Sequence, residues 1–223
     1  MFYDNKPQIK IGNNWSYDAW GLFLNSGWQL ESAKPNIIMV DVPAGDGALD
    51  MSESLTGYPV YGNRNLKFEL VFTQPETEWD GIRKTVENYC NGQRMNITLP
   101  HDQTHYLSGR ISTGSLKRDK GVGSFDITAI CDPWRYKNDI TVVDITIGTT
   151  GVYTGVLTNE RRRVIPEITT SATVDVTING ITESVSAGTF KFTDLVLTEG
   201  DNDLKITGPS GTTATIKYQE ANF

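Results

Sequence analysis

The sequence is poor in the residues that build disulfide frameworks and metal sites. It contains 2 cysteines and 2 histidines in 223 residues. Cys90 and Cys131 stand among apolar neighbours and are too few for a disulfide framework, so we expect buried, reduced thiols in a protein made in a cytoplasm. His101 and His105 flank Asp102 in a proline-led polar run that opposes a helix and offers no further ligand nearby. We therefore predict no metal site and no cofactor.

Long apolar runs and positive charge are also scarce. No run approaches the ~20 residues that cross a bilayer, and the opening letters MFYDNKPQIKI lack a basic region followed by an apolar stretch. We expect neither membrane insertion nor a secretory signal. The formal net charge is -7, whereas surfaces that bind DNA gather Lys and Arg against the phosphates. Only two short basic clusters occur, at 117–120 and 161–163, so we predict no specific nucleic-acid binding.

What the sequence does contain is the composition of a turn-rich β protein. Glycine is abundant, with 21 residues, and short segments of alternating apolar and polar residues lie between turn signals. One segment has a different period, because apolar residues from Trp79 to Cys90 recur at helical spacing. Thr77 is the expected N-cap of this helix, and Asn91-Gly92 is the expected stop. We predict an all-β protein with one helix.

The stretch Pro43–Phe72 joins a polar loop to a core strand. Gly45-Asp46-Gly47 is a turn signal, because glycine supplies positive φ and Asp can bond the nearby backbone. Apolar residues then occupy every second position from Leu66 to Phe72, as in a half-buried strand. Before the loop, the apolar run Pro35–Val42 predicts another strand that leads into it.

The remaining N-terminal segments predict further strands around one core. Aromatic residues crowd positions 15–28, and we interpret them as core and lid, with a sugar-binding platform as the alternative. Pro133 is expected to end the last strand, because proline lacks a ladder donor. The predicted strands are 8–11, 95–99, 106–116 and 121–131, with a loop at 100–105 and a basic hairpin tip at 117–120.

The composition changes after Tyr136. All the Trp, Met and Cys residues lie before this point, and the remainder is rich in Thr, Val and Ile. Residues 139–223 carry 6 basic and 11 acidic side chains, so most of the negative charge lies there. Asn179-Gly180 between alternating runs is a strong hairpin signal. We predict two domains, residues 1–138 and 139–223, the second a sandwich with strands at 141–147, 173–178, 189–197, 204–207 and 213–218.

Three segments, taken in order, resemble the distal tail protein (Dit) family of long-tailed, non-contractile bacteriophages and prophages. They are GDGALDMSESLTGYPVYGNR within Pro43–Phe72, YCNGQRMNITLPHDQTHYLSGR at Tyr89–Arg110, and ICDPWRY at Ile130–Tyr136. From about Arg163 onward, the letters VIPEI, EGDND and TATIKY look like the smaller C-terminal domain of the family. The resemblance spans most of the chain, and the ordered set is more specific than any one motif.

The resemblance implies a structural protein without catalytic residues. Such proteins form a hexameric ring below the tail tube, with N-terminal sandwiches in the ring and galectin-like C-terminal sandwiches pointing outward. The ring joins the tail tube protein to the tail-associated tip protein, lets DNA pass, and has receptor-binding proteins as further expected partners. The expected location is the virion tail tip, after assembly in the bacterial host cytoplasm. His101 and His105 depart from the family pattern, which tends to be acidic in this loop, so no contact is carried over onto it.

A ring of negatively charged copies must overcome their mutual repulsion. We expect apolar burial to drive closure, helped by pairing of Lys117, Arg118 and Lys120 with acids of a neighbouring copy. The same basic tip also suits a solvated hairpin end that discourages edge-to-edge strand pairing.

Two other functions remain open from the residues alone. A carbohydrate-binding adhesin would use the outer sandwich or the aromatic segment 15–28, but residues 139–223 contain no Trp, and we predict no measurable sugar binding by that domain. A glycoside hydrolase would need a pair of carboxylates, and no pair stands out. Asp46, Asp50 and Glu53 lack the regular oxygen spacing and the terminal bidentate acid of a calcium loop.

Overall fold

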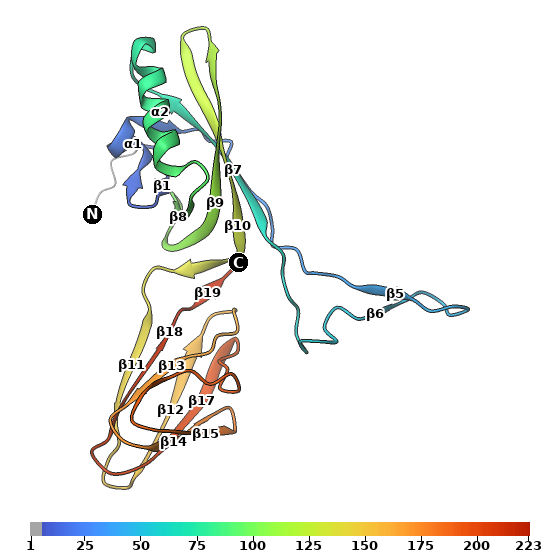
Figure 1. Cartoon of the computed structure of the whole chain (residues 1–223), viewed down its shortest axis with the longest axis vertical. Coiled ribbons are helices and arrows are strands. Elements are labelled where there is room, and N and C mark those ends of the chain that lie inside the picture. The colour runs from blue at the N-terminus through green and yellow to red at the C-terminus, as the bar shows by residue number, and fades with distance from the viewer. Residues whose placement is uncertain (1–5) are drawn as a thin grey trace. The chain divides into compact units, whose positions relative to one another are not determined.

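The computed structural model describes residues 6–223 and divides the chain into two compact units. Unit 1 runs to Arg135 and includes Phe223, and unit 2 comprises Tyr136–Asn222. Each unit has its own hydrophobic core. Figure 1 shows the strands that build each unit. Antiparallel strand pairs build both units, and the one long helix lies in unit 1. The predicted fold class, all-β with one main helix, is confirmed.

Unit 1 is built on an antiparallel sheet that curls around its core. The strand order is β2-β1-β8-β9-β10-β7-β3, with β4 also paired to β7. The hairpin of β9 and β10 turns at Lys120 and Gly121, which both have positive φ. The strands are β1 (Lys10–Ile11), β2 (Asn14–Trp15), β3 (Leu22–Leu24), β4 (Gln29–Leu30), β7 (Arg64–Phe72), β8 (Arg94–Leu99), β9 (Asp102–Asp119) and β10 (Val122–Lys137).

The aromatic segment 15–28 contributes to this core. Leu22 and Leu24 of β3 are buried, and Trp20 and Trp28 pack against the core at its margin. The short helix α1 (Ser16–Trp20), which was not predicted, ends at Gly21 with φ 64. These contacts support the interpretation of the segment as core and lid.

Helix α2 (Trp79–Cys90) lies on the sheet with the predicted face inward. Trp79, Val86 and Cys90 are buried, so the helical spacing read from the sequence identifies the packed face correctly. Gly123 of β10 permits the contact, because a Cβ at that position would lie 2.6 Å from the Trp79 ring. A side chain at 123 would push the helix off the sheet.

The sequence predicted the C-terminal end of α2 correctly but not its N-terminal end. The stop is confirmed, since the helix ends at Cys90 with Asn91 as C-cap and Gly92 at φ 75. The predicted cap at Thr77 is wrong. A 3-10 turn, η1 (Glu76–Glu78), leads directly into the helix, so Glu78 becomes the N-cap residue and makes no side-chain cap bond.

The ends of β9 and β10 also differ from the predictions. The loop expected at 100–105 is only a tight turn, because Asp102 pairs with Leu99 and starts β9. Pro133 does not end β10. The pairing of β10 with β7 extends only as far as Cys131, which lies opposite Arg64. Pro133 lies beyond this pairing, so its missing N–H removes no hydrogen bond between β10 and β7.

Between β4 and β7 the chain leaves the sheet as a hairpin, residues 32–62, which we call the arm. Its strands β5 (Met39–Asp41) and β6 (Ala48–Asp50) pair only with each other and extend away from the sheet of unit 1 (Figure 1). The predicted Gly45-Asp46-Gly47 turn lies at the tip, where Ala44 and Gly47 have positive φ. The predicted strand Pro35–Val42 is therefore shorter than expected, and the predicted polar loop includes a second strand.

Unit 2 is a sandwich of two four-stranded sheets, β11-β18-β13-β16 and β12-β17-β14-β15. Apolar residues at alternate positions of facing strands fill the core between the sheets. The predicted hairpin turn is confirmed, because Asn179 and Gly180 have φ 50 and 84. The strands are β11 (Thr141–Thr146), β12 (Val152–Asn159), β13 (Glu167–Thr170), β14 (Val174–Ile178), β15 (Ile181–Val185), β16 (Gly188–Phe190), β17 (Gly200–Thr207) and β18 (Thr213–Tyr218), followed by β19 (Ala221–Asn222).

The strand predicted at 189–197 is wrong. Only its start belongs to a strand, β16, and the rest is irregular chain from which Leu195 and Leu197 enter the core. Buried residues at alternate positions can therefore occur in a segment that forms no hydrogen bonds to a neighbouring strand. Within residues 6–223, no helix has the length and apolar character needed to span a membrane.

Candidate assembly surface

The arm keeps its shape through its own hydrogen bonds. At its base the Asn36 N–H donates to the Val60 carbonyl at 2.8 Å, and the Gly62 N–H donates to the Lys34 carbonyl at 2.9 Å. Further out, the Ile38 N–H donates to Ser52 Oγ at 2.9 Å. The arm is thus an ordered hairpin, and its strands pair only with each other among the described residues of unit 1.

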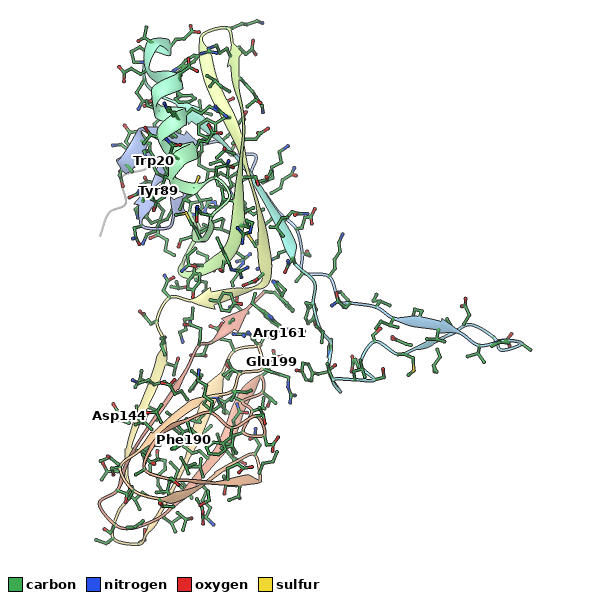
Figure 2. All side chains as sticks on the ribbon, in the orientation of Figure 1. Trp20, Tyr89, Asp144, Arg161, Phe190 and Glu199 are labelled. Carbon is green, nitrogen blue, oxygen red and sulfur yellow. The ribbon has the colours of Figure 1, made fainter. Side chains whose placement is uncertain are left out.

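The apolar side chains of the arm are exposed. Ile37 is 66% exposed, Leu49 is 54% exposed and Leu55 is 95% exposed, whereas core residues of unit 1 such as Leu66 are fully buried. Figure 2 shows side chains standing out from both strands of the arm. The other exposed apolar residues of the arm are Ile38, Met39, Val40, Val42, Tyr58 and Val60. Concentrated apolar exposure of this kind marks surfaces that bind other proteins, so the arm is the candidate assembly surface.

The basic tip at 117–120, predicted to lie in an interface, is engaged within the chain. Lys117 Nζ lies 2.9 Å from Asp126 Oδ2 and 3.1 Å from Glu69 Oε1. The hydrogen bond to Asp126, followed by that to Glu69, raises the pKa of Lys117. Arg118 pairs with acids of α2 and of the turn before it, and Lys120 lies in the turn itself. These pairs are largely exposed, and exposed ion pairs add little stability, so they do not lock the tip.

The segment that contains the two histidines, residues 100–105, has a hydrogen-bond network at the start of β9. Asp102 Oδ1 lies 3.2 Å from His105 Nδ1 and accepts from Thr104 Oγ1 at 2.8 Å. Burial raises the pKa of Asp102, but the hydrogen bonds from Thr104 and His105 outweigh it and lower the pKa overall. His101 instead lies beside Trp28, with ring centroids 6.1 Å apart. In the described part of the chain, no three His, Cys, Asp or Glu residues are grouped to hold a metal ion.

Both cysteines are free and buried, as predicted. Burial raises the pKa of Cys90 and of Cys131 to about 11, so both thiols stay protonated near neutral pH. A thiol that is not ionised is a poor nucleophile, and these residues act as small apolar side chains in the core of unit 1.

No family model and no curated protein matches the sequence. Among solved structures, the chain matches the Dit protein (gp 19.1) of phage SPP1, described as a paradigm of the hub adsorption apparatus in phages that infect Gram-positive bacteria. The TM-score is 0.68, and the match covers 97% of this chain and 99% of that one at 16% identity. The fold is Dit-like. A further match, to a de novo designed double-stranded β-helix, has a TM-score of only 0.27 and covers 37% of this chain at 19% identity.

The Dit fold covers both units, and the motifs that carried the sequence resemblance lie at defined places in it. The first motif forms the outer part of the arm and enters β7, and the second runs from the end of α2 into β9. What the sequence interpretation missed is that the first motif is exposed. No local signal reveals this exposure, because the segment that covers a strand can come from a distant part of the chain.

Proposed function

We propose that this protein is a structural component of a phage tail, a distal tail hub that joins the tail tube to the host-recognition proteins of the tip. The observation that carries the proposal is the Dit fold over 97% of the chain. In this role six copies form a ring, DNA passes through its channel, and the tail tube protein, the tail-associated tip protein and receptor-binding proteins are its partners. The protein works in the virion, after assembly in the bacterial host cytoplasm, and catalyses no reaction.

The arm supports this proposal, because it offers apolar surface that is exposed within residues 6–223. A cyclic assembly repeats one heterologous interface until it closes, so each copy must present a surface that another copy accepts. With a formal charge of -7 per chain, copies repel one another, and apolar burial has to outweigh that repulsion. We retain Lys117, Arg118 and Lys120 as proposed ring-interface residues, since the internal pairs of Lys117 and Arg118 can exchange for acids of a neighbour.

The two units divide the work in this proposal. Residues 1–138 form the ring, and residues 139–223 form an outward, galectin-like domain. Limited proteolysis is expected to cut near Lys137–Ile140 and to release two stable fragments. Cuts spread evenly through 141–223 would show that the second domain does not fold independently.

The experiment that tests the proposed function is the mass and shape of the purified protein in solution. Multi-angle light scattering at micromolar concentration is expected to give the mass of a hexamer, and negative-stain images are expected to show closed rings at low and at high salt. A gel-shift assay is expected to show no shift of duplex DNA at physiological salt. The channel of the ring has to let DNA pass, so it must not bind the DNA. A monomer at every concentration, or a clear DNA shift, contradicts the proposal.

The second candidate, a carbohydrate-binding adhesin, has one observation in its favour. Phe190 of β16 is 41% exposed and lies against Phe192, with ring centroids 6.2 Å apart. An exposed aromatic face can stack on a sugar ring. A single exposed ring is a weaker argument than a fold match over the whole chain, so the structural role is preferred.

A further inference from the structure

One arginine in the core of unit 1 has no partner for its charge. Arg64, the first residue of β7, is 3% exposed. Its Nε and Nη2 are buried, and no acceptor within residues 6–223 lies in hydrogen-bonding range of either atom. A buried guanidinium without hydrogen bonds or a counterion costs several kcal/mol in general, so its presence calls for a missing partner.

A second arginine adds to the excess of positive charge. Arg135 lies on β10 on the same face as Cys131, the residue opposite Arg64, because residues 131 and 135 are separated by an even number of positions. The Nε of Arg135 is also buried without an acceptor in the described chain. Burial, followed by the nearby charge of Arg135, lowers the pKa of Arg64.

Asp102 is the acid that pairs with Arg135, and its oxygens are already engaged. Asp102 Oδ2 lies 3.5 Å from Arg135 Nη1, and Oδ1 takes the bonds from Thr104 and His105. Two guanidinium groups against one carboxylate leave one positive charge. Cys131 does not neutralise it, because its thiol is protonated at neutral pH with a pKa of about 11.

We propose that Arg64 and Arg135 form a binding site for one carboxylate group at the end of the unit 1 sheet. A carboxylate is the planar monoanion that matches the parallel N–H groups of a guanidinium, and one negative charge balances the cluster. The site lies where the arm ends and β7 begins. Its ligand is either a small free carboxylate or an acidic side chain of a second copy. The second source rests on the proposed assembly, whereas the first does not.

The test measures unfolding of unit 1 in sodium formate and in sodium chloride at equal ionic strength and fixed neutral pH. Tryptophan fluorescence reports on unit 1 alone, because every Trp of the chain lies at or before Trp134. Three proteins are compared: wild type, Arg64→Met and Arg110→Met. Arg110 is an exposed arginine of the same sheet whose Nη1 donates to the Gly92 carbonyl, so it is a matched control.

Formate is expected to raise the Tm of dilute, monomeric wild type above its value in chloride, in a saturable way and by on the order of 4 °C. Arg64→Met should lose this rise, and Arg110→Met should keep it. Arg64→Lys, which keeps the charge without the planar fork, should show a smaller rise and provides the test if Arg64→Met does not fold. Equal Tm values in formate and chloride, or a full rise in Arg64→Met, overturn the proposal.

The two sources are separated by repeating the titration at a concentration where wild type is assembled. If a neighbour supplies the carboxylate, the assembled protein no longer responds to formate, and Arg64→Met dissociates at higher protein concentrations than wild type. If the ligand is a free carboxylate, the response is the same in monomer and assembly. Both results support the site, and failure of assembly itself would contradict the proposed function while leaving the monomer titration intact.

Discussion

The arm and the β14–β15 hairpin share a local hairpin pattern but differ in environment. Each has apolar strand residues and a glycine turn with positive φ, and each forms an antiparallel pair. Val176 of β14 is fully buried under the second sheet of unit 2, whereas Val40 of β5 is 47% exposed. The local sequence therefore specifies a hairpin in both places. Its apolar face is buried only where a second sheet packs against it. In unit 2 the chain supplies that sheet itself, whereas the apolar side chains of the arm stay exposed within residues 6–223.

The largest expected effect comes from breaking the self-covered hairpin. Val176→Asp places an unpaired carboxylate between two sheets, which should destabilise unit 2 by at least about 4 kcal/mol. Urea unfolding followed by far-UV circular dichroism is expected to show loss of the unit 2 transition, while tryptophan fluorescence from unit 1 changes little. Retention of wild-type stability would mean that this hairpin is not part of the core.

The same substitution in the arm should give the opposite pattern. Val40→Asp is expected to change the free energy of unfolding of the monomer by less than about 0.5 kcal/mol, since the site is exposed. Assembly, followed by light scattering across a dilution series, should weaken at least about tenfold because a charge enters an apolar interface. Val142→Asp is the matched control, because Val142 of β11 is 48% exposed but lies outside the arm. Equal weakening in both variants would remove the arm from the interface.

A smaller effect is expected at a polar contact that unit 2 makes within itself. The Glu220 side chain is 7% exposed, and its Oε1 lies 2.7 Å from Lys137 Nζ. Burial raises the pKa of Glu220, but hydrogen bonds from Lys137 and Thr141 outweigh it, so the pKa lies below the ordinary 4.5. A lowered folded-state pKa means that the ionised carboxylate stabilises the fold above pH 4.5 and loses this effect as pH falls through the folded value.

Glu220→Gln should therefore cost about 1–2 kcal/mol at pH 7, and the difference from wild type should shrink below pH 4.5. Urea unfolding followed by circular dichroism at pH 7 and at pH 3 measures both values. The exposed Glu199 provides the control, Glu199→Gln, for which we expect no comparable loss. A difference that grows in acid would contradict the assigned role of the ion pair.

The last prediction is the absence of sugar binding. The outer face of unit 2 offers Phe190 but no Trp, so the full-length protein is expected to bind no sugar on a glycan panel. Binding of millimolar affinity or tighter that is lost in Phe190→Ala would favour the adhesin alternative. It would also show that unit 2, like the arm, presents a surface for an external partner.

Sequence reasoning succeeded where the deciding interactions are local or periodic. Two periodic patterns identify an element and its buried face: the alternation along β7 and the helical spacing in α2. The Asn179-Gly180 turn identifies the hairpin of β14 and β15. The sequence interpretation did not identify β12, β13 or β15 as strands, because their Thr-containing patterns are weak strand signals without their pairing partners.

The errors arise where a distant segment decides the outcome. Pro133 continues a strand because β7 happens to stop opposite Cys131, and no neighbour in sequence reveals that length. The arm was predicted as a strand and a polar loop because nothing near Val40 indicates whether another layer will cover it. At the basic tip, Lys117 meets Glu69 and Asp126 only once β7, β9 and β10 are aligned, so its internal ion pairs were not foreseen.

The strand order of unit 1 also has a consequence for how the protein is made. Phe68 of β7 pairs with Ile127 of β10, so β7 has to wait for about sixty more residues before this partner leaves the ribosome. At synthesis rates of roughly 5–20 residues per second, that interval lasts about 3–12 seconds. During it, the apolar face of β7 and the arm are exposed together in the nascent chain, whereas β14 meets β15 across a two-residue turn almost at once. The period of greatest risk of aggregation therefore precedes the synthesis of β10, and chaperone binding during translation should concentrate on the first 120 or so residues.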